Sequence, residues 1–116
     1  NEEKIVVQKS GNAKYTYNTL QEITNYEDVD KVKDIISQID WENKIVDMAR
    51  PADYRFFFQY KNSKIQVKAI IYNVCISPNK NQLEIVSDSD GYAHLNKENS
   101  SILFETLTRE NLFNLK

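Results

Sequence analysis

The sequence predicts an α+β fold, in which a single domain combines a mostly antiparallel sheet of about five to six strands with two helices. Two segments repeat apolar residues at spacings of three and four, as helices do. The other segments are short, rich in β-branched and aromatic residues, and bounded by turn-forming residues. The resulting order is ββαββββα. Strands follow one another in this order instead of alternating with helices, which is typical of the α+β class.

The length of the chain also indicates one domain. Its 116 residues fit one hydrophobic core, since compact domains commonly contain about 100 to 150 residues. No repeat, low-complexity tract or linker divides the sequence. We therefore expect one domain over residues 1–116.

Two strands are expected at the start of the chain. The first covers residues 4–10, "KIVVQKS", where β-branched residues precede the turn-forming "SGN". The second covers about residues 15–23, because apolar residues alternate there with polar ones.

A helix is expected over about residues 26–39. Its apolar residues recur every three or four positions and leave the charged residues on the opposite side. These apolar residues are Val29, Val32, Ile35, Ile36 and Ile39. Thr24 or Asn25 can cap the first turn, and Glu27 and Asp28 place negative charge at the positive end of the helix dipole.

The second half of the chain begins with a connector, "ENKIVDMARPAD", in which Pro51 lacks an N–H group and disfavours a helix at the residue before it. Four strands should follow, the first three joined by the loops "KNS" and "PNKN" in an antiparallel meander. They are expected over residues 53–60, 64–77, 82–88 and 91–95. A closing helix begins after Asn96, which can cap it.

The first strand of this meander, "DYRFFFQY", is strongly aromatic. Because side chains alternate along a strand, one face holds Tyr54, Phe56, Phe58 and Tyr60. We expect this aromatic face to pack against the helix over residues 26–39. Phe57 points the other way, between Arg55 and Gln59. It is either covered by the closing helix or left partly exposed.

Composition limits the partners and the chemistry. The net charge is −2, whereas nucleic-acid binding needs a basic face, so we expect no nucleic-acid partner. Cys75 is the only cysteine, which leaves no disulfide framework, and its apolar neighbours predict a buried thiol. No apolar run reaches the roughly 18 residues of a membrane span. The chain starts at Asn1 instead of methionine, from which we expect that a signal or anchor segment was removed.

A calcium loop is the nearest match to a metal-binding motif, and it is incomplete. Asp88, Asp90 and Gly91 fit such a loop, but Val86 and Lys97 occupy two positions that require carboxylates. We therefore expect a hairpin turn in which glycine has a positive φ.

Catalytic motifs are not found either. His94 is the only histidine, and we expect it to be a solvated strand residue. The sequence has no Gly-x-Ser-x-Gly elbow and no glycine-rich phosphate loop. We expect no catalytic residue, no cofactor and no metal.

Charged residues nevertheless cluster around the connector. Asp47 and Asp53 flank "MARPA", and Arg50 lies between them. Loops often contain functional residues, so a small enzyme that uses Asp47, Arg50 and Asp53 is one hypothesis. The other is local ion pairing that orders the connector. The candidate structural or binding residues are Asp47, Arg50, Asp53, Tyr54, Arg55 and Phe57.

Residues 31–107 resemble a family of small, uncharacterised bacillus-type extracytoplasmic proteins that are often predicted lipoproteins. The resemblance depends on an amphipathic helix that leads into a specific connector motif, then a hairpin sheet and a closing helix. The motif is matched by Ile45, Val46, Asp47, Met48, Ala49, Pro51, Asp53 and Tyr54. The resemblance implies a location outside the membrane of a Gram-positive cell and implies no activity.

Taken together, these observations favour a noncatalytic, extracytoplasmic binding or interaction module associated with the cell membrane. Its partner would be an envelope component or another protein. Membrane association would depend on an anchor that this chain does not contain. The small enzyme with the Asp47, Arg50 and Asp53 cluster is the alternative.

Overall fold

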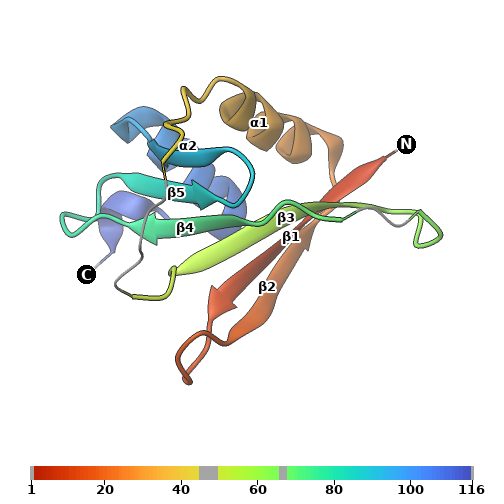
Figure 1. Ribbon diagram of the computed structural model, residues 1–116, viewed down its shortest axis with the longest axis horizontal. Helices are drawn as coiled ribbons and strands as arrows, with labels where there is room; N and C mark the ends of the chain where they lie inside the picture. Colours follow the sequence, from red (N-terminus) through yellow and green to blue (C-terminus); the bar gives the residue numbers. More distant parts are fainter. Residues whose placement is uncertain (1, 45–49, 66–67, 116) are drawn as a thin grey trace.

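The computed structural model describes residues 2–44, 50–65 and 68–115 (Figure 1). Its helices and strands are β1 (Glu3–Ser10), β2 (Tyr17–Ile23), α1 (Tyr26–Ser37), β3 (Tyr54–Tyr60), β4 (Tyr72–Ile76), β5 (Leu83–Ser87), β6 (Gly91–His94), α2 (Lys97–Thr108) and a short 3₁₀-helix, η1 (Leu112–Asn114). Apart from η1, which the sequence pattern did not predict, the order is ββαββββα. The predicted α+β class is confirmed.

The strands form one antiparallel sheet in the order β2-β1-β3-β4-β5-β6. Strands β3 to β6 follow one another across the sheet, which confirms the predicted meander. The first strand lies inside the sheet, because β1 pairs with β2 on one side and with seven residues of β3 on the other.

Strand β4 is much shorter than the strand predicted over residues 64–77. Only Tyr72–Ile76 belongs to the sheet, where all five residues pair with β5. Backbone N–H and C=O groups in a strand require a neighbouring strand as partner. β3 pairs with β4 only through Tyr54, Arg55 and Phe56, so the described residues before Tyr72 have no ladder to join. The prediction was wrong there because composition does not reveal where a partner strand ends.

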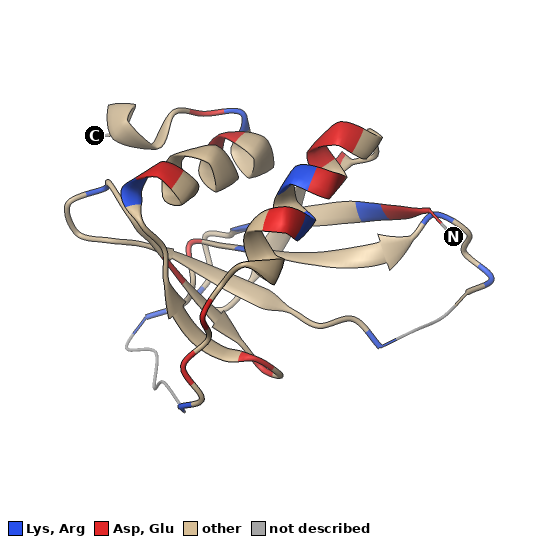
Figure 2. Ribbon diagram, turned by 90° about the horizontal axis from the view of Figure 1, so that it is seen from above, with Lys and Arg blue, Asp and Glu red and all other residues tan. Residues whose placement is uncertain are grey.

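Both helices pack against the same face of the sheet (Figure 2). Helix α1 begins where the capping residues predicted, since the Asn25 side chain accepts a hydrogen bond from the Asp28 N–H at 2.9 Å. It ends at Ser37, two residues earlier than expected, although Ile39 still packs against the core. Asn96 caps α2 in the same way, accepting from the Asn99 N–H at 2.7 Å.

The aromatic face of β3 lies under both helices, not only under α1 as predicted. Phe56 is fully buried and Tyr54 is 6% exposed. The Tyr54 ring meets the Phe104 ring of α2 edge-on, with centroids 5.6 Å apart. Phe58, farther along the strand, lies beneath the Lys33 ammonium of α1. The prediction missed α2 because the two helices divide the length of β3 between them.

Phe57 is partly exposed on the opposite face of the sheet. It pairs there with Val6 of β1. The closing helix lies on the other face, so only the second of the two predicted environments for Phe57 is correct. None of the helices in the described residues lies over this face of the sheet (Figures 1 and 2), and it is called the open face below.

Candidate functional site

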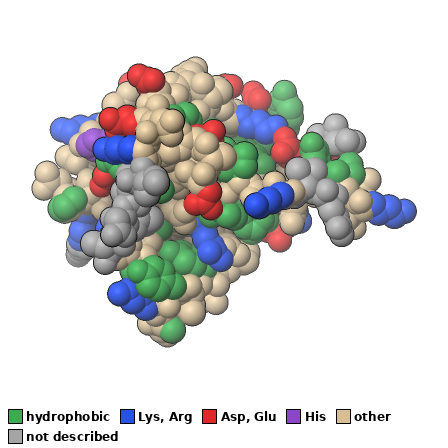
Figure 3. All heavy atoms as spheres, viewed as in Figure 1, with side chains coloured by type: hydrophobic (Ala, Val, Ile, Leu, Met, Phe, Trp, Pro, Cys, Tyr) green, Lys and Arg blue, Asp and Glu red, His purple; other side chains and the backbone are tan. Residues whose placement is uncertain are grey.

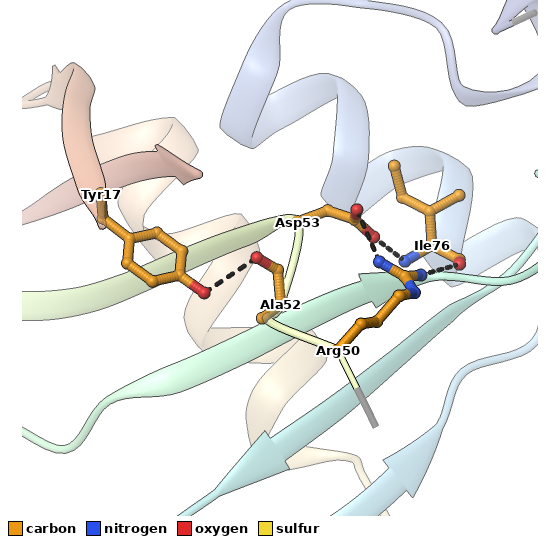
Figure 4. Close-up of polar contacts among 5 residues, drawn as sticks. All are labelled: Tyr17, Arg50, Ala52, Asp53 and Ile76. Carbon is orange, nitrogen blue, oxygen red and sulfur yellow. Dashed lines mark hydrogen bonds and ion pairs between the residues drawn. The ribbon is translucent and has the colours of Figure 1, made fainter. Parts of the chain in front are cut away.

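Arg50 and Asp53 join the described end of the connector to the end of β4 (Figure 4). Asp53 Oδ1 accepts from Arg50 Nη1 at 2.8 Å, and Asp53 Oδ2 accepts from the backbone N–H of Ile76 at 2.8 Å. Arg50 Nη2 donates to the Ile76 carbonyl oxygen at 3.1 Å. The Arg50 and Asp53 side chains therefore bind each other and both backbone groups of Ile76, which is far from them in the sequence.

Two further hydrogen bonds tie the same segment to β1 and β2. The Ser10 N–H donates to the Asp53 carbonyl oxygen at 3.1 Å. The Tyr17 hydroxyl donates to the carbonyl oxygen of Ala52 at 2.9 Å, and Ala52 is buried. The segment before β3 is thus bonded to three strands, which fixes where the aromatic strand enters the sheet.

The chemistry of this cluster follows from how its groups are already used. Both carboxylate oxygens of Asp53 accept hydrogen bonds, and the bond to Asp53 raises the pKa of Arg50 further above its usual value. Groups paired in this way orient a backbone segment. Asp47, the third member of the predicted cluster, lies outside the described residues.

The remaining predicted residues lie on opposite sides of the sheet. Tyr54 belongs to the core under α2, whereas Arg55 and Phe57 lie on the open face. Arg55 places its guanidinium 4.2 Å from the centre of the Tyr17 ring and donates from Nε to Gln8 Oε1 at 2.5 Å. Because side chains alternate along β3, Tyr54 is buried, whereas Arg55 and Phe57 lie together on the surface.

Tyr17 was not among the predicted site residues. Burial is the main cause that raises its pKa, and the nearby Arg55 cation opposes that effect. The register shift between Val7 and Gln8 determines where Tyr17 points, because β2 has one extra residue there. An irregularity of this kind has no clear signal in the sequence of either strand.

A second group on the open face belongs to β5 and β6. The Tyr92 hydroxyl donates to the Glu84 carboxylate, and the Lys44 ammonium lies 4.5 Å from the centre of the Tyr92 ring. Burial and the Glu84 carboxylate raise the pKa of Tyr92 to about 12. On the side of the molecule seen in Figure 1, hydrophobic and cationic side chains lie next to one another on the surface (Figure 3).

Cys75 also lies on the open face and is only partly buried, so the prediction of a buried thiol was wrong. Tyr72 and Val74 point into the core, and alternation along β4 therefore turns Cys75 to the other side. Burial is the main cause that raises the pKa of its thiol. An apolar run such as "YNVCIS" does not reveal which face a residue occupies when only one face is covered.

The turn between β5 and β6 has the conformation expected of a hairpin. Gly91 has a φ of 108°, and a Cβ atom there would lie 2.2 Å from the Glu42 carbonyl oxygen. The Ser87 hydroxyl accepts from the Asp90 N–H at 3.2 Å. His94 is exposed at the end of β6, as predicted.

Within residues 2–44, 50–65 and 68–115, no three histidine, cysteine, aspartate or glutamate side chains are grouped so that they could hold a metal ion. None of the described helices has the length and apolar character needed to cross a membrane.

A family model described as "YhfM protein" matches residues 1–112. No curated protein and no solved structure matches the chain.

Proposed function

The chain belongs to the YhfM protein family, and from this premise we propose that it is a noncatalytic binding or interaction module of a Gram-positive cell envelope. The observation that supports a binding role is the open face of the sheet. None of the described helices covers this face, and the strand registers place aromatic and arginine side chains on it. They are Tyr17, Arg55, Phe57 and Tyr92, all partly exposed. Arginine and aromatic residues are enriched at binding surfaces.

The envelope location is supported by the resemblance of the connector motif to bacillus-type extracytoplasmic proteins, many of them predicted lipoproteins. The location can be tested in the source cells with a tagged full-length protein. We expect added protease to cleave the protein on intact protoplasts. Cleavage only after the protoplasts are lysed would contradict the proposal.

The alternative, a small enzyme that uses Asp47, Arg50 and Asp53, has less support. A general base must offer a lone pair to the proton that it removes. Asp53 already accepts one hydrogen bond on each oxygen, from Arg50 and from the Ile76 N–H. These contacts favour a structural role for the carboxylate and leave binding as the preferred proposal.

Binding can be tested by co-sedimentation with purified envelope fragments from a Gram-positive bacterium. Phe57→Ser removes a partly exposed ring from the open face. Tyr26→Ser, the control, removes a ring that is 80% exposed at the start of α1, away from this face. We expect Phe57→Ser to weaken binding at least about fivefold, as at an energetically important contact, and Tyr26→Ser to leave it unchanged.

Urea unfolding of both variants shows whether each is folded under the binding conditions. Arg55→Gln provides a second open-face variant with a smaller effect on packing. Equal binding by the parent and by all three variants would rule out the open face as the binding surface. Absence of binding by the parent would rule out the envelope role.

A further inference from the structure

Beside the Arg50–Asp53 pair, the end of β1, the start of β3 and the β4–β5 turn surround a hollow of about 390 Å³. Its charged lining residues are three cations, Lys9, Arg50 and Lys80, and one carboxylate, Asp53. Leu115 and Ile76 contribute apolar wall. The hollow is therefore cationic, although the whole chain has a net charge of −2.

The one carboxylate in this lining does not neutralise the two lysines. Its oxygens are used by Arg50 Nη1 and by the Ile76 N–H, both at 2.8 Å. Within the part of the chain that the structure describes, neither Lys9 nor Lys80 forms an ion pair. Two ammonium groups are thus available to an anion that enters the hollow.

The two lysines stand on backbone that the fold holds at the edge of the hollow. The Lys9 ammonium is 6.0 Å from the centre of the Tyr54 ring, which is itself held in the core. Lys80 is partly buried and has a φ of 56° in the β4–β5 turn, where its N–H donates to the Ser77 carbonyl oxygen at 2.9 Å. Non-glycine residues rarely adopt this backbone conformation.

Arg50 adds donors of fixed geometry. A guanidinium has five N–H groups, and in the described contacts Arg50 uses one for Asp53 and one for the Ile76 carbonyl. Further N–H groups can therefore meet an oxyanion. The pair with Asp53 holds the guanidinium in place for that contact, and guanidinium groups fit phosphate oxygens well.

We propose that this hollow binds the phosphate group of a phosphomonoester or phosphodiester, held by Lys9, Lys80 and Arg50. Several cations around one hollow suit a group that offers more than one charged oxygen. This site goes beyond the proposed envelope role and does not depend on it. The hollow is defined by its own residues, and its test needs no envelope component.

The test is an NMR titration of the folded protein with inorganic phosphate, at constant ionic strength because salt screens exposed charges. We expect saturable shifts of the backbone amides of Ser10, Ser77 and Lys80. Lys9→Gln and Lys80→Gln should each weaken binding about threefold, and the double variant about tenfold, because exposed charge pairs contribute modestly.

The matched control is the double variant Lys14→Gln and Lys64→Gln, which removes two exposed lysines outside the hollow. It makes the same change in net charge and should bind like the parent. If the phosphate shifts do not saturate, or if the two double variants bind equally, the proposal is wrong. Arg50 is kept in all these variants because it also joins the connector to β4.

Two further probes identify the source of the phosphate. A soluble glycerol phosphate oligomer that competes with inorganic phosphate would assign the site to a phosphodiester polymer. Phosphatidylcholine vesicles that compete only when they contain phosphatidylglycerol would assign it to a lipid headgroup. Binding to those anionic vesicles without binding of inorganic phosphate would overturn the proposal, because surface charge alone would then explain the attraction.

Discussion

At the scale of single residues, Asp53 shows how one side chain can determine the path of a segment. Its carboxylate holds the Arg50 guanidinium and the Ile76 N–H, and its carbonyl oxygen accepts from Ser10. The Arg50 side chain is half exposed, so the ion pair by itself contributes little. The hydrogen bond to the backbone of β4 contributes more, because it is partly buried and an unpaired N–H there would cost free energy.

Asp53→Ala should lower the free energy of unfolding by about 1 to 3 kcal/mol, because the partly buried Ile76 N–H loses its acceptor. Urea unfolding measures this loss. Asp88→Ala, at an exposed turn position, is the control and should change the free energy by less than about 0.5 kcal/mol. A value for Asp53→Ala within error of the parent would show that this contact does not stabilise the fold.

Tyr92 leads to a prediction at alkaline pH. Its pKa is raised from 10.0 to about 12 by burial and by Glu84. The folded state therefore keeps the phenol proton more tightly than the unfolded state does. The stability from this difference is complete below about pH 10 and is lost as the pH rises through about 12. Tyr92→Phe should make stability fall less steeply with pH in this range, as measured by urea unfolding at several pH values.

Tyr17, Tyr54 and Tyr72 also have raised pKa values, mainly because of burial. Part of the decline in stability with rising pH should therefore persist in Tyr92→Phe. Tyr26→Phe, at an exposed position, is the control and should leave the decline unchanged. An equal decline in the parent and in Tyr92→Phe would contradict the assignment of this pH dependence to Tyr92.

At the scale of elements, β3 shows how a two-layer arrangement gives one strand two different roles. One side supplies Phe56 and Tyr54 to the core, where Phe56 stacks on Tyr72 with ring centroids 5.1 Å apart. The other side places Arg55 and Phe57 on the open face. The alternation of side chains along the strand predicted these two faces. It did not reveal which face the helices would cover.

Replacing adjacent phenylalanines of β3 tests the two roles within one element. Phe56→Ala should lower the free energy of unfolding by about 3 to 5 kcal/mol, because a fully buried ring leaves a cavity. Phe57→Ala should cost clearly less, since Phe57 is partly exposed and water can fill the space. Urea unfolding of both variants measures the difference, and equal losses would contradict the assignment of the two faces.

At the scale of the whole molecule, the N-terminal strand holds the sheet together. β1 pairs with β2 through one ladder and with β3 through a ladder of seven residues, whereas β3 and β4 share only three pairs. Its Ile5 and Val7 are fully buried under the helices. The most stable region should therefore be the β1–β3 pair, and the edges of the sheet should open more easily.

Hydrogen exchange measures this order directly. We expect the slowest backbone amides in β1 and β3, near Val7 and Phe56, and faster exchange in β6 at the edge of the sheet. Local opening costs least where backbone hydrogen bonds are few and exposed. Slower exchange in β6 than in the β1–β3 pair would show that the meander, and not the N-terminal strand, is the stable centre.

The sequence by itself determined the kinds and order of the α-helices and strands, the caps at Asn25 and Asn96, and the two faces of β3. These features depend on residues that are neighbours in the chain, so spacing and side-chain chemistry are enough to predict them.

Only the tertiary structure decided the place of β1 inside the sheet, the short length of β4 and the exposure of Cys75. It also decided the contacts among Arg50, Asp53 and Ile76, and the hydrogen bond from Tyr17 to Ala52. Each depends on which distant segments pair and on which face the helices cover. The free energy of such pairing comes from burial and from hydrogen bonds that form only when those segments meet. It therefore cannot be predicted from a short stretch of sequence.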